Sequence, residues 1–202
     1  MIISQKISSY IAETLCEDNI VNKDEKDIYV YCFDYIIELL IFFIIIFISG
    51  LITKRIPVSI IFMITAFSIR SFGGGMHAST PGLCSIISFI IFYTILFTAK
   101  PLSYTMTWGW CIVHILSIII ILLTAPVDTP KRPMSPEKRK KLKKRCIVVC
   151  LFLFTAFIGF YMNKLQLYYG TLAICSTIFS MSILIGHIIN KLSINRGGIR
   201  WT

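Results

Sequence analysis

The sequence predicts an all-α polytopic membrane protein, with about six transmembrane or re-entrant helices and an N-terminal amphipathic helix at the membrane interface. Hydrophobic residues make up 56% of the 202-residue chain, and its mean hydropathy is +0.78, whereas soluble domains are about 45–50% apolar. The excess is gathered into separate blocks, several of which approach the roughly 20 residues that a helix needs to cross a bilayer. We therefore expect one membrane domain over residues 1–202, with its membrane helices between residues 35 and 189.

Residues 1–17 have the periodicity of an amphipathic helix. Large apolar residues recur on one face, and Lys6, Ser9 and Glu13 fall on the other. The apolar face consists of Ile3, Ile7, Tyr10, Ile11 and Leu15. Such a helix can lie on the membrane surface or pack against the rest of the protein, and the sequence leaves both alternatives open.

Six apolar segments follow, and each is a candidate membrane helix. They are Tyr35–Thr53, Ile56–Ile69, Leu83–Ala99, Trp108–Thr124, Cys146–Met162 and Leu167–Ile189. The second segment is short, and at about 1.5 Å per residue it barely crosses the hydrocarbon layer. We therefore expect it to be tilted, re-entrant or extended through Phe72.

Basic residues are concentrated in one loop. The chain carries 20 Lys and Arg against 10 Asp and Glu, and nine of the 20 lie in the 125–145 loop. The second half of this loop, Glu137–Arg145, is expected to extend the fifth membrane helix. Because the bilayer takes up most of the chain, we expect no nucleic-acid partner, and the excess indicates anionic membrane lipid or an acidic peptide.

The basic residues also predict an orientation. If the N-terminus is cytoplasmic and all six segments cross, 16 of the 20 basic residues face the cytoplasm. The positive-inside rule then places both termini, the 70–83 loop and the 125–145 loop on the cytoplasmic side. Lys54 and Arg55 oppose this orientation.

The residues with the clearest chemical potential lie in the loop 70–84. Three consecutive glycines precede His77, and Pro81-Gly82 precedes Cys84. In a continuous helix, the seven positions between His77 and Cys84 would separate them by about 10.5 Å along the axis. Because Pro81 and Gly82 are expected to break any helix before the third span, a turn can instead bring the imidazole within about 3–4 Å of the sulfur.

A histidine beside a cysteine at a helix start has a chemical use. A neighbouring imidazolium or a helix N-terminus lowers the pKa of a thiol from its usual value of about 8.5, and the thiolate is the nucleophile. Backbone N–H groups at the helix start are available to stabilise an oxyanion. The residues alone leave open the simpler interpretation of a loop histidine and a buried thiol.

The pattern Arg-x4-Gly-x-His-x6-Cys resembles a signature of the accessory gene regulator protein B (AgrB) family. A second stretch, in which Ala125-Pro126 precedes a long basic run, resembles another signature of that family. The resemblance covers nearly the whole chain. The matching residues are Arg70, Gly75, His77 and Cys84 in the first pattern, and Lys131, Arg132 and Pro133 after Ala125-Pro126.

The resemblance implies a membrane cysteine endopeptidase of Gram-positive quorum sensing. AgrB proteins cut the C-terminal tail from a small precursor peptide, AgrD, and the acyl group passes through an enzyme thioester to an internal thiol or hydroxyl that closes the autoinducing ring. His77 and Cys84 match the catalytic pair, and Arg70 and Gly75 match positions that activity requires. The family also implies a homodimer in the bacterial cell membrane, with the active site on the cytoplasmic side.

The family's substrates carry an acidic C-terminal tail, which the basic loop is suited to bind. We select its binding residues as Lys131, Arg132, Lys138, Arg139, Lys140 and Lys141. Glu38 is a candidate for a third catalytic residue that orients His77, although an acid near the start of a span is also favoured by the helix dipole. Arg70 has an alternative role as a snorkelling anchor at the end of its span.

Other chemistry has little support in the sequence. The seven cysteines show neither a disulfide framework nor zinc-site spacing, and we expect five of them to be small buried hydrophobes: Cys32, Cys111, Cys146, Cys150 and Cys175. His114 and His187 lie inside spans, where helix packing is the expected role. We expect no metal and no nucleotide cofactor, because no His-Glu-x-x-His motif or phosphate loop is present. The alternative function is a non-catalytic peptide export or channel component.

Overall fold

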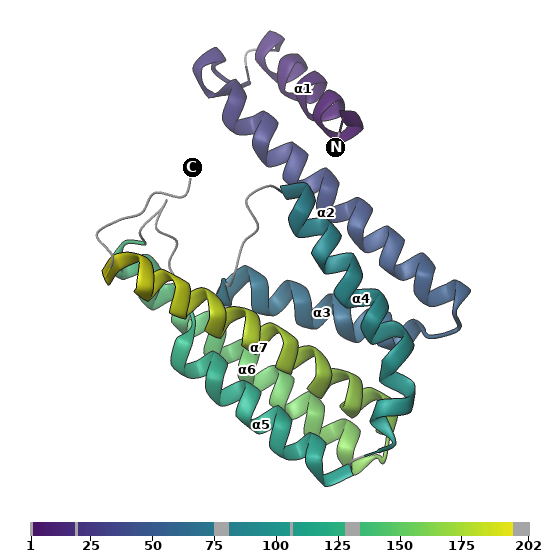
Figure 1. Ribbon diagram of the computed structural model, residues 1–202. Coiled ribbons are helices and arrows are strands. Elements are labelled where there is room, and N and C mark those ends of the chain that lie inside the picture. Colours follow the sequence, from purple (N-terminus) through teal and green to yellow (C-terminus); the bar gives the residue numbers. More distant parts are fainter. Residues whose placement is uncertain (1, 19, 75–80, 106, 128–133, 196–202) are drawn as a thin grey trace. The chain divides into compact units, whose positions relative to one another are not determined.

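A computed structural model of the chain describes residues 2–18, 20–74, 81–105, 107–127 and 134–195. In these residues the chain is all-helical and contains no strand, which confirms the predicted fold class (Figure 1). The α-helices are α1 (Ile2–Glu17), α2 (Lys26–Ile52), α3 (Ile56–Gly73), α4 (Pro81–Ser103), α5 (Thr107–Thr124), α6 (Pro136–Met162) and α7 (Gln166–Asn195). A single 3-10 turn, Lys23–Glu25, precedes α2.

Five of these helices are long and apolar enough to cross a membrane. They comprise α2, α3, α6 and the parts of α4 and α7 at Ser85–Ser103 and Gln166–Leu192. Helix α5 is apolar but shorter, at Trp108–Thr124. The second predicted segment continues past Ile69 to Gly73, which confirms its extension through Phe72. The chain is therefore a polytopic helical membrane protein.

Two helix starts differ from the prediction. Helix α2 begins at Lys26 instead of Tyr35. Its first turns mix the charged residues Lys26, Asp27 and Asp34 with apolar ones, and only its later part is continuously apolar. Helix α4 begins at Pro81, so Pro81 and Gly82 lie inside its first turn instead of breaking the chain before it. Proline is tolerated there because the first helical N–H has no partner within the helix. The predicted extension of the fifth helix is confirmed, since α6 begins at Pro136 with Ser135 as its N-cap.

The chain forms two compact units, the N-terminal unit (Met1–Ile52) and the C-terminal unit (Thr53–Thr202). In the N-terminal unit, α1 packs against α2, and Lys26 Nζ lies 2.9 Å from Glu13 Oε1. The buried positions of α1 are Ser4, Ser8 and Ala12, which recur every fourth residue and form one stripe.

The apolar face predicted for α1 is only partly the face that packs, because Ile11 and Leu15 are half-buried. Ile7 and Tyr10 are exposed, with 72% of Tyr10 accessible. Small side chains at Ser4, Ser8 and Ala12 allow two helices to approach closely, which large residues would prevent. The helix therefore packs through its small residues and leaves apolar side chains available for a membrane surface.

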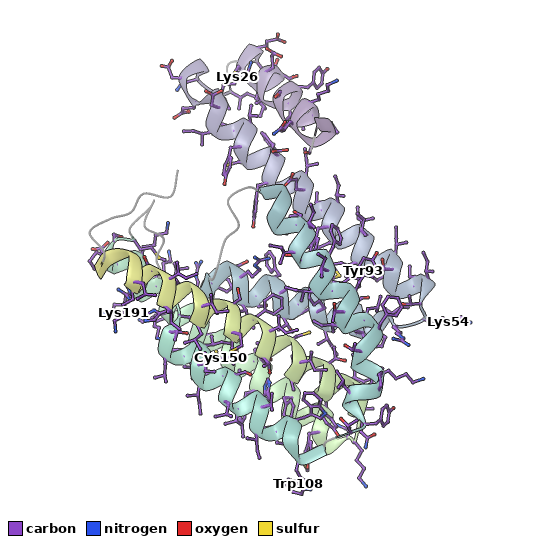
Figure 2. The ribbon with its side chains drawn as sticks, in the orientation of Figure 1. Lys26, Lys54, Tyr93, Trp108, Cys150 and Lys191 are labelled. Carbon is purple, nitrogen blue, oxygen red and sulfur yellow. The ribbon has the colours of Figure 1, made fainter. Side chains whose placement is uncertain are left out.

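In the C-terminal unit, α7 is the central helix and contacts α3, α4, α5 and α6 (Figure 1). Tyr169, Leu172, Ala173 and Ile183 of α7 are buried in this contact. Phe62 of α3 joins the core between Phe92 and Phe179, at centroid distances of 5.2 and 5.8 Å. Trp108 and Lys191 lie at opposite ends of this helical unit (Figure 2).

Helices α4 and α7 approach each other closely at Gly170. A Cβ atom added to Gly170 would collide with the Cβ and Cα atoms of Ser103, at 2.7 and 3.0 Å. We expect Gly170→Ala to lower the free energy of unfolding by about 1–3 kcal/mol, because overpacking a well-packed contact costs about that much. Thermal unfolding in detergent measures the change.

Gly159 provides the matched control, because a Cβ added there meets nothing within 4 Å. Gly159→Ala should be neutral, or stabilising by up to about 1 kcal/mol through helix propensity. Equal midpoints for the two variants would contradict the close α4–α7 contact.

Candidate active site

The catalytic loop was predicted at residues 70–84, but both of its ends are helical: α3 continues to Gly73 and α4 begins at Pro81. The predicted loop is therefore shorter than expected. His77 and Gly75 fall outside the described residues, which stop at residue 74 and resume at residue 81. The contact between His77 and Cys84 therefore remains a prediction. What the structure describes is the pair of helix ends that hold this loop and the residues around them.

Cys84 lies in the first turn of α4, three residues after Pro81. The first N–H groups of an α-helix have no partner inside the helix, and the helix dipole adds partial positive charge there. Such a position favours an anion such as a thiolate and offers N–H donors to a developing oxyanion. The backbone setting of Cys84 is therefore suited to the chemistry that the sequence predicts.

Arg70 connects the two ends of the loop. It lies in the last turn of α3, and its Nη1 donates a hydrogen bond of 2.8 Å to Ser88 Oγ of α4. Ser88 is buried and follows Cys84 by four residues, so the two positions are on the same side of α4, one turn apart. The guanidinium is therefore fixed one helical turn from the position of the predicted nucleophile.

This bond gives a test of how Arg70 supports the site. Ser88→Ala should slow precursor cleavage about tenfold, because the charged donor loses a partner worth about 1.5–3 kcal/mol and α4 loses its link to α3. Ser88→Thr keeps a hydroxyl and should recover most of the rate. The rate constants for single turnover provide the measurement.

Two further variants separate this link from general damage to α4. Thr94→Ala removes an exposed hydroxyl that donates to Ile90 of its own helix, and it should leave the rate unchanged. In the double variant Arg70→Ala/Ser88→Ala, the loss should be less than the product of the single losses. Independent, multiplicative losses would show that the bond does not position the site.

The end of α3 is also held by the connection between α5 and α6. Val127 donates its backbone N–H to the Gly73 carbonyl at 3.0 Å. Gly74 has a φ of +72°, and a Cβ there would lie 3.0 Å from the Val127 carbonyl oxygen. Only glycine adopts this conformation at no steric cost, so the backbone that leads into the predicted loop is fixed against residues 125–127.

The basic start of α6 lies at the same end of the C-terminal unit. Lys143 Nζ donates to the carbonyl oxygens of Ala125, at 2.7 Å, and Leu122. The Arg145 guanidinium lies 5.7 Å from the ring centroid of Phe72, which is two residues from Arg70. Cationic side chains of α6 thus contact the segments that flank the predicted catalytic loop.

The predicted tail-binding residues divide into two groups. Lys138, Arg139, Lys140 and Lys141 are exposed on the first turns of α6, where a peptide can reach them. Lys131 and Arg132 lie outside the described residues. Glu38 lies on α2 of the N-terminal unit, and its proposed role beside His77 remains a prediction.

The remaining cysteines and histidines have mostly structural settings. Cys146, Cys150 and Cys175 are buried as predicted, but Cys32 is exposed and Cys111 is half-buried, so the prediction of a buried thiol was wrong for Cys32. Apolar surroundings in sequence do not bury a residue on the outer face of a membrane helix. His114 is buried and stacks on Phe157 at a centroid distance of 4.4 Å.

Sequence reasoning missed three residues near the predicted loop, Ser88, Lys143 and Phe72. Ser88 accepts a hydrogen bond from Arg70, Lys143 donates to the Ala125 carbonyl oxygen, and Phe72 lies beside the Arg145 guanidinium. Ser88 could have been found from its four-residue spacing after Cys84 on a predicted helix. Lys143 was counted as part of a basic run, and nothing in that run distinguishes it from its neighbours. Among the described residues, no group of three or more His, Cys, Asp or Glu is arranged to hold a metal ion.

Known proteins of one family resemble this chain over nearly its whole length. The family model described as "Accessory gene regulator B" matches residues 4–189. A "Putative AgrB-like protein 2" of Clostridium perfringens is 27% identical over 170 residues, which cover 79% of each chain. A "Putative AgrB-like protein" of Clostridium beijerinckii is 30% identical over 164 residues, covering 81% of this chain and 78% of the relative.

A relative that matches over a shorter stretch carries the same family name. An "Accessory gene regulator protein B" of Staphylococcus lugdunensis is 33% identical over 102 residues, covering 48% of this chain and 52% of the relative. No solved structure gives a significant match.

Proposed function

The chain belongs to the accessory gene regulator B (AgrB) family, and we propose that it is a membrane cysteine endopeptidase with Cys84 as nucleophile and His77 as its base. Membership in this family gives the chain a role in accessory gene regulator quorum sensing, in which AgrB proteins work with an AgrD precursor peptide. The proposed activity is cleavage of the C-terminal tail of such a precursor and support of its cyclisation.

One observation carries the proposal. The hydrogen bond from Arg70 to Ser88 joins the two helices that bracket the loop, and it lies one turn from Cys84 at the start of α4. Two residues of the family pattern are thereby connected: Arg70 directly, and Cys84 through its helix. An arginine that only anchored α3 in headgroups would need no partner on α4.

The proposed chemistry runs in two steps. His77 accepts the proton of the Cys84 thiol, the thiolate attacks the peptide carbonyl carbon, and N–H groups at the start of α4 stabilise the oxyanion. The imidazolium then protonates the leaving amine, the C–N bond breaks, and an acyl thioester remains on Cys84. A thiol or hydroxyl within the peptide gives its proton to His77 and attacks this thioester, which closes the ring and releases the Cys84 thiolate.

The distribution of charge supports a cytoplasmic active site. In the C-terminal unit, the end that carries the loop flanks also carries Arg70, Lys191 and the cations of α6 from Lys138 to Arg145. The opposite end carries Lys54, Arg55, Lys100 and Lys164, and its aromatic residues Trp108 and Tyr161 contact each other. An excess of Lys and Arg marks the cytoplasmic side, so we place the loop and the start of α6 there.

The same charges support an acidic peptide as substrate. Glu137 is the only acid among the described residues of the C-terminal unit, so the exposed cations of α6 have few internal partners to neutralise them. A cationic surface beside the loop raises the local concentration of an acidic tail and orients it before the chemical step. As in other family members, we expect the enzyme to act as a homodimer.

Neutralising exposed cations tests the role of this surface. Lys138→Gln/Lys141→Gln should raise KM for a precursor with an acidic tail about threefold to tenfold at low salt, with kcat unchanged, because the tail contributes binding and not chemistry. The effect should vanish at about 0.5 M salt, where charges beyond a few ångströms are screened. A precursor whose tail acids are replaced by amides is the control, and it should not distinguish the variant from the parent enzyme.

A direct test of the activity uses co-expression. The chain should cleave the C-terminal tail from a small open reading frame encoded beside it, with product detected by mass spectrometry in membranes. A non-catalytic export component would move the peptide across the membrane without shortening it. Uncleaved but exported precursor would therefore contradict the peptidase assignment.

A further inference from the structure

A groove of about 430 Å³ lies between the end of α5, the start of α6 and the last part of α7. Its walls come from three helices of the C-terminal unit, so it is a feature of the packed bundle and not of one surface loop. The side chains that matter for a ligand are Leu123, Thr124, Arg139, Lys140, Lys143 and His187. Arg139 and Lys140 belong to the predicted tail-binding surface, but the proposed chemical steps at Cys84 use none of the six.

The charges of the groove lining favour an anion. Arg139, Lys140 and Lys143 bring three positive charges to it, and the lining contains no Asp or Glu. The position of Lys143 is fixed, because its ammonium group donates hydrogen bonds to the Ala125 and Leu122 carbonyl oxygens. Arg139 and Lys140 lie on the same helix one turn earlier, where they are exposed and available to a ligand.

The groove also lies where polar headgroups meet hydrocarbon. Helix α6 passes from cationic residues to exposed apolar ones directly after Arg145, at Ile147 and Val148. On α5, an exposed apolar face leads to the groove and ends at Leu123, whose side chain is 78% accessible. That face consists of Ile112, Leu116, Ile119 and Leu123.

We propose that this groove binds the headgroup phosphate of an anionic phospholipid, with its acyl chains lying along the apolar face of α5. Arg139 and Lys140 contact the phosphate, because a guanidinium and an ammonium group are both strong donors to its oxygens. The apolar face distinguishes a lipid from soluble phosphate, since a free ion gains nothing from Leu123. A peptide tail is the less suitable occupant, because its polar backbone would lie against the same apolar residues.

Lipid retention tests the proposal without any reference to peptide cleavage. The full chain is reconstituted in vesicles of phosphatidylglycerol and phosphatidylcholine, extracted in mild detergent and examined by native mass spectrometry. Arg139→Gln/Lys140→Gln should bind phosphatidylglycerol about 25-fold more weakly than the parent, because each of the two cations near a membrane surface contributes about fivefold. Arg139→Lys/Lys140→Arg keeps both charges and should retain the lipid.

Lys138→Gln/Lys141→Gln is the matched control, because it removes two exposed charges of the same helix that do not line the groove. It should retain phosphatidylglycerol at the parent level. Equal loss of lipid in the two double variants would overturn the proposal, since a diffuse charge effect would then explain the binding.

Two further outcomes identify other occupants. If inorganic phosphate displaces phosphatidylglycerol at millimolar concentration, the site is one for a soluble anion and the lipid proposal fails. If the groove variant keeps its lipid but shows a raised KM for an acidic peptide in phosphatidylcholine vesicles, the occupant is the peptide tail and the lipid proposal also fails. Loss of bound phosphatidylglycerol in the groove variant alone supports it, whether or not the chain is a peptidase.

Discussion

Cys84→Ala should reduce cleavage of the cognate precursor to below detection, a loss of at least about 10³-fold, because the proposed mechanism has no other group to carry the acyl chain. The variant should still insert in the membrane, since Cys84 lies in the first turn of α4, at the edge of the helix and not in its middle. Product formation in isolated membranes, normalised to the amount of inserted protein, provides the measurement.

Cys111 supplies the control for Cys84. It is a half-buried thiol of α5, at the opposite end of that helix from the groove, and has no role in the proposed mechanism. Cys111→Ala should cleave at the parent rate. Normal cleavage by Cys84→Ala would exclude the covalent mechanism whatever the other variants do.

His77→Ala should lower the cleavage rate by about 10²–10⁴-fold, the usual contribution of a general acid–base catalyst. A histidine close enough to act as base also stabilises the thiolate, so the parent enzyme should react with iodoacetamide at Cys84 below the usual thiol pKa of about 8.5. In His77→Ala, alkylation of the peptide that contains Cys84 should require a higher pH. Mass spectrometry of that peptide across a pH series measures both rates.

The alkylation profile distinguishes catalysis from simple loss of structure. A misfolded loop would change the amount of reactive protein, whereas loss of the imidazole changes the pH at which the thiol reacts. His114→Gln is the control, because His114 is buried against Phe157 within the bundle and should not affect the profile. An identical profile in His77→Ala and the parent would contradict contact between the two side chains.

Much of the fold follows from hydropathy and helix-end signals. Long apolar runs predict α2, α6 and α7 because a membrane helix satisfies its own backbone hydrogen bonds and needs only length and apolar side chains. The helical extension at the cationic start of α6 was predicted over Glu137–Arg145, and the helix begins one residue earlier, at Pro136. The N-terminal bounds of α2 and α4 were less accurate, because charged residues interrupt the apolar residues in the first turns of α2, and α4 begins with a proline.

The packing of α1 shows what periodicity cannot decide. The sequence predicts one apolar face that includes Ile7, Tyr10, Ile11 and Leu15. Ile11 and Leu15 are half-buried, but Ile7 and Tyr10 are exposed, and the fully buried residues are Ser4, Ser8 and Ala12. In water, an apolar face must be buried within the protein, but near a membrane the lipid can cover it. The packed face is then selected by close approach, which favours small side chains.

The sequence predicts which residues form the candidate site, but not the contacts between helices that hold them. Arg70, Gly75, His77 and Cys84 are recognisable by their spacing, but the spacing does not show that Arg70 reaches Ser88 on the next helix. The contacts of Lys143 with Ala125 and of Arg145 with Phe72 join segments far apart in sequence. Such long-range contacts depend on how the helices pack, and a local pattern carries no information about them.

The mass of the enzyme during turnover tests the central claim most directly. The reconstituted chain is incubated with a precursor whose ring-closing thiol or hydroxyl is removed, so that the acyl group cannot leave by cyclisation. We predict an adduct with the mass of the N-terminal precursor fragment, located on Cys84 and released by neutral hydroxylamine. Cleavage of the tail without any adduct on Cys84, or with an adduct on another residue, would contradict the account.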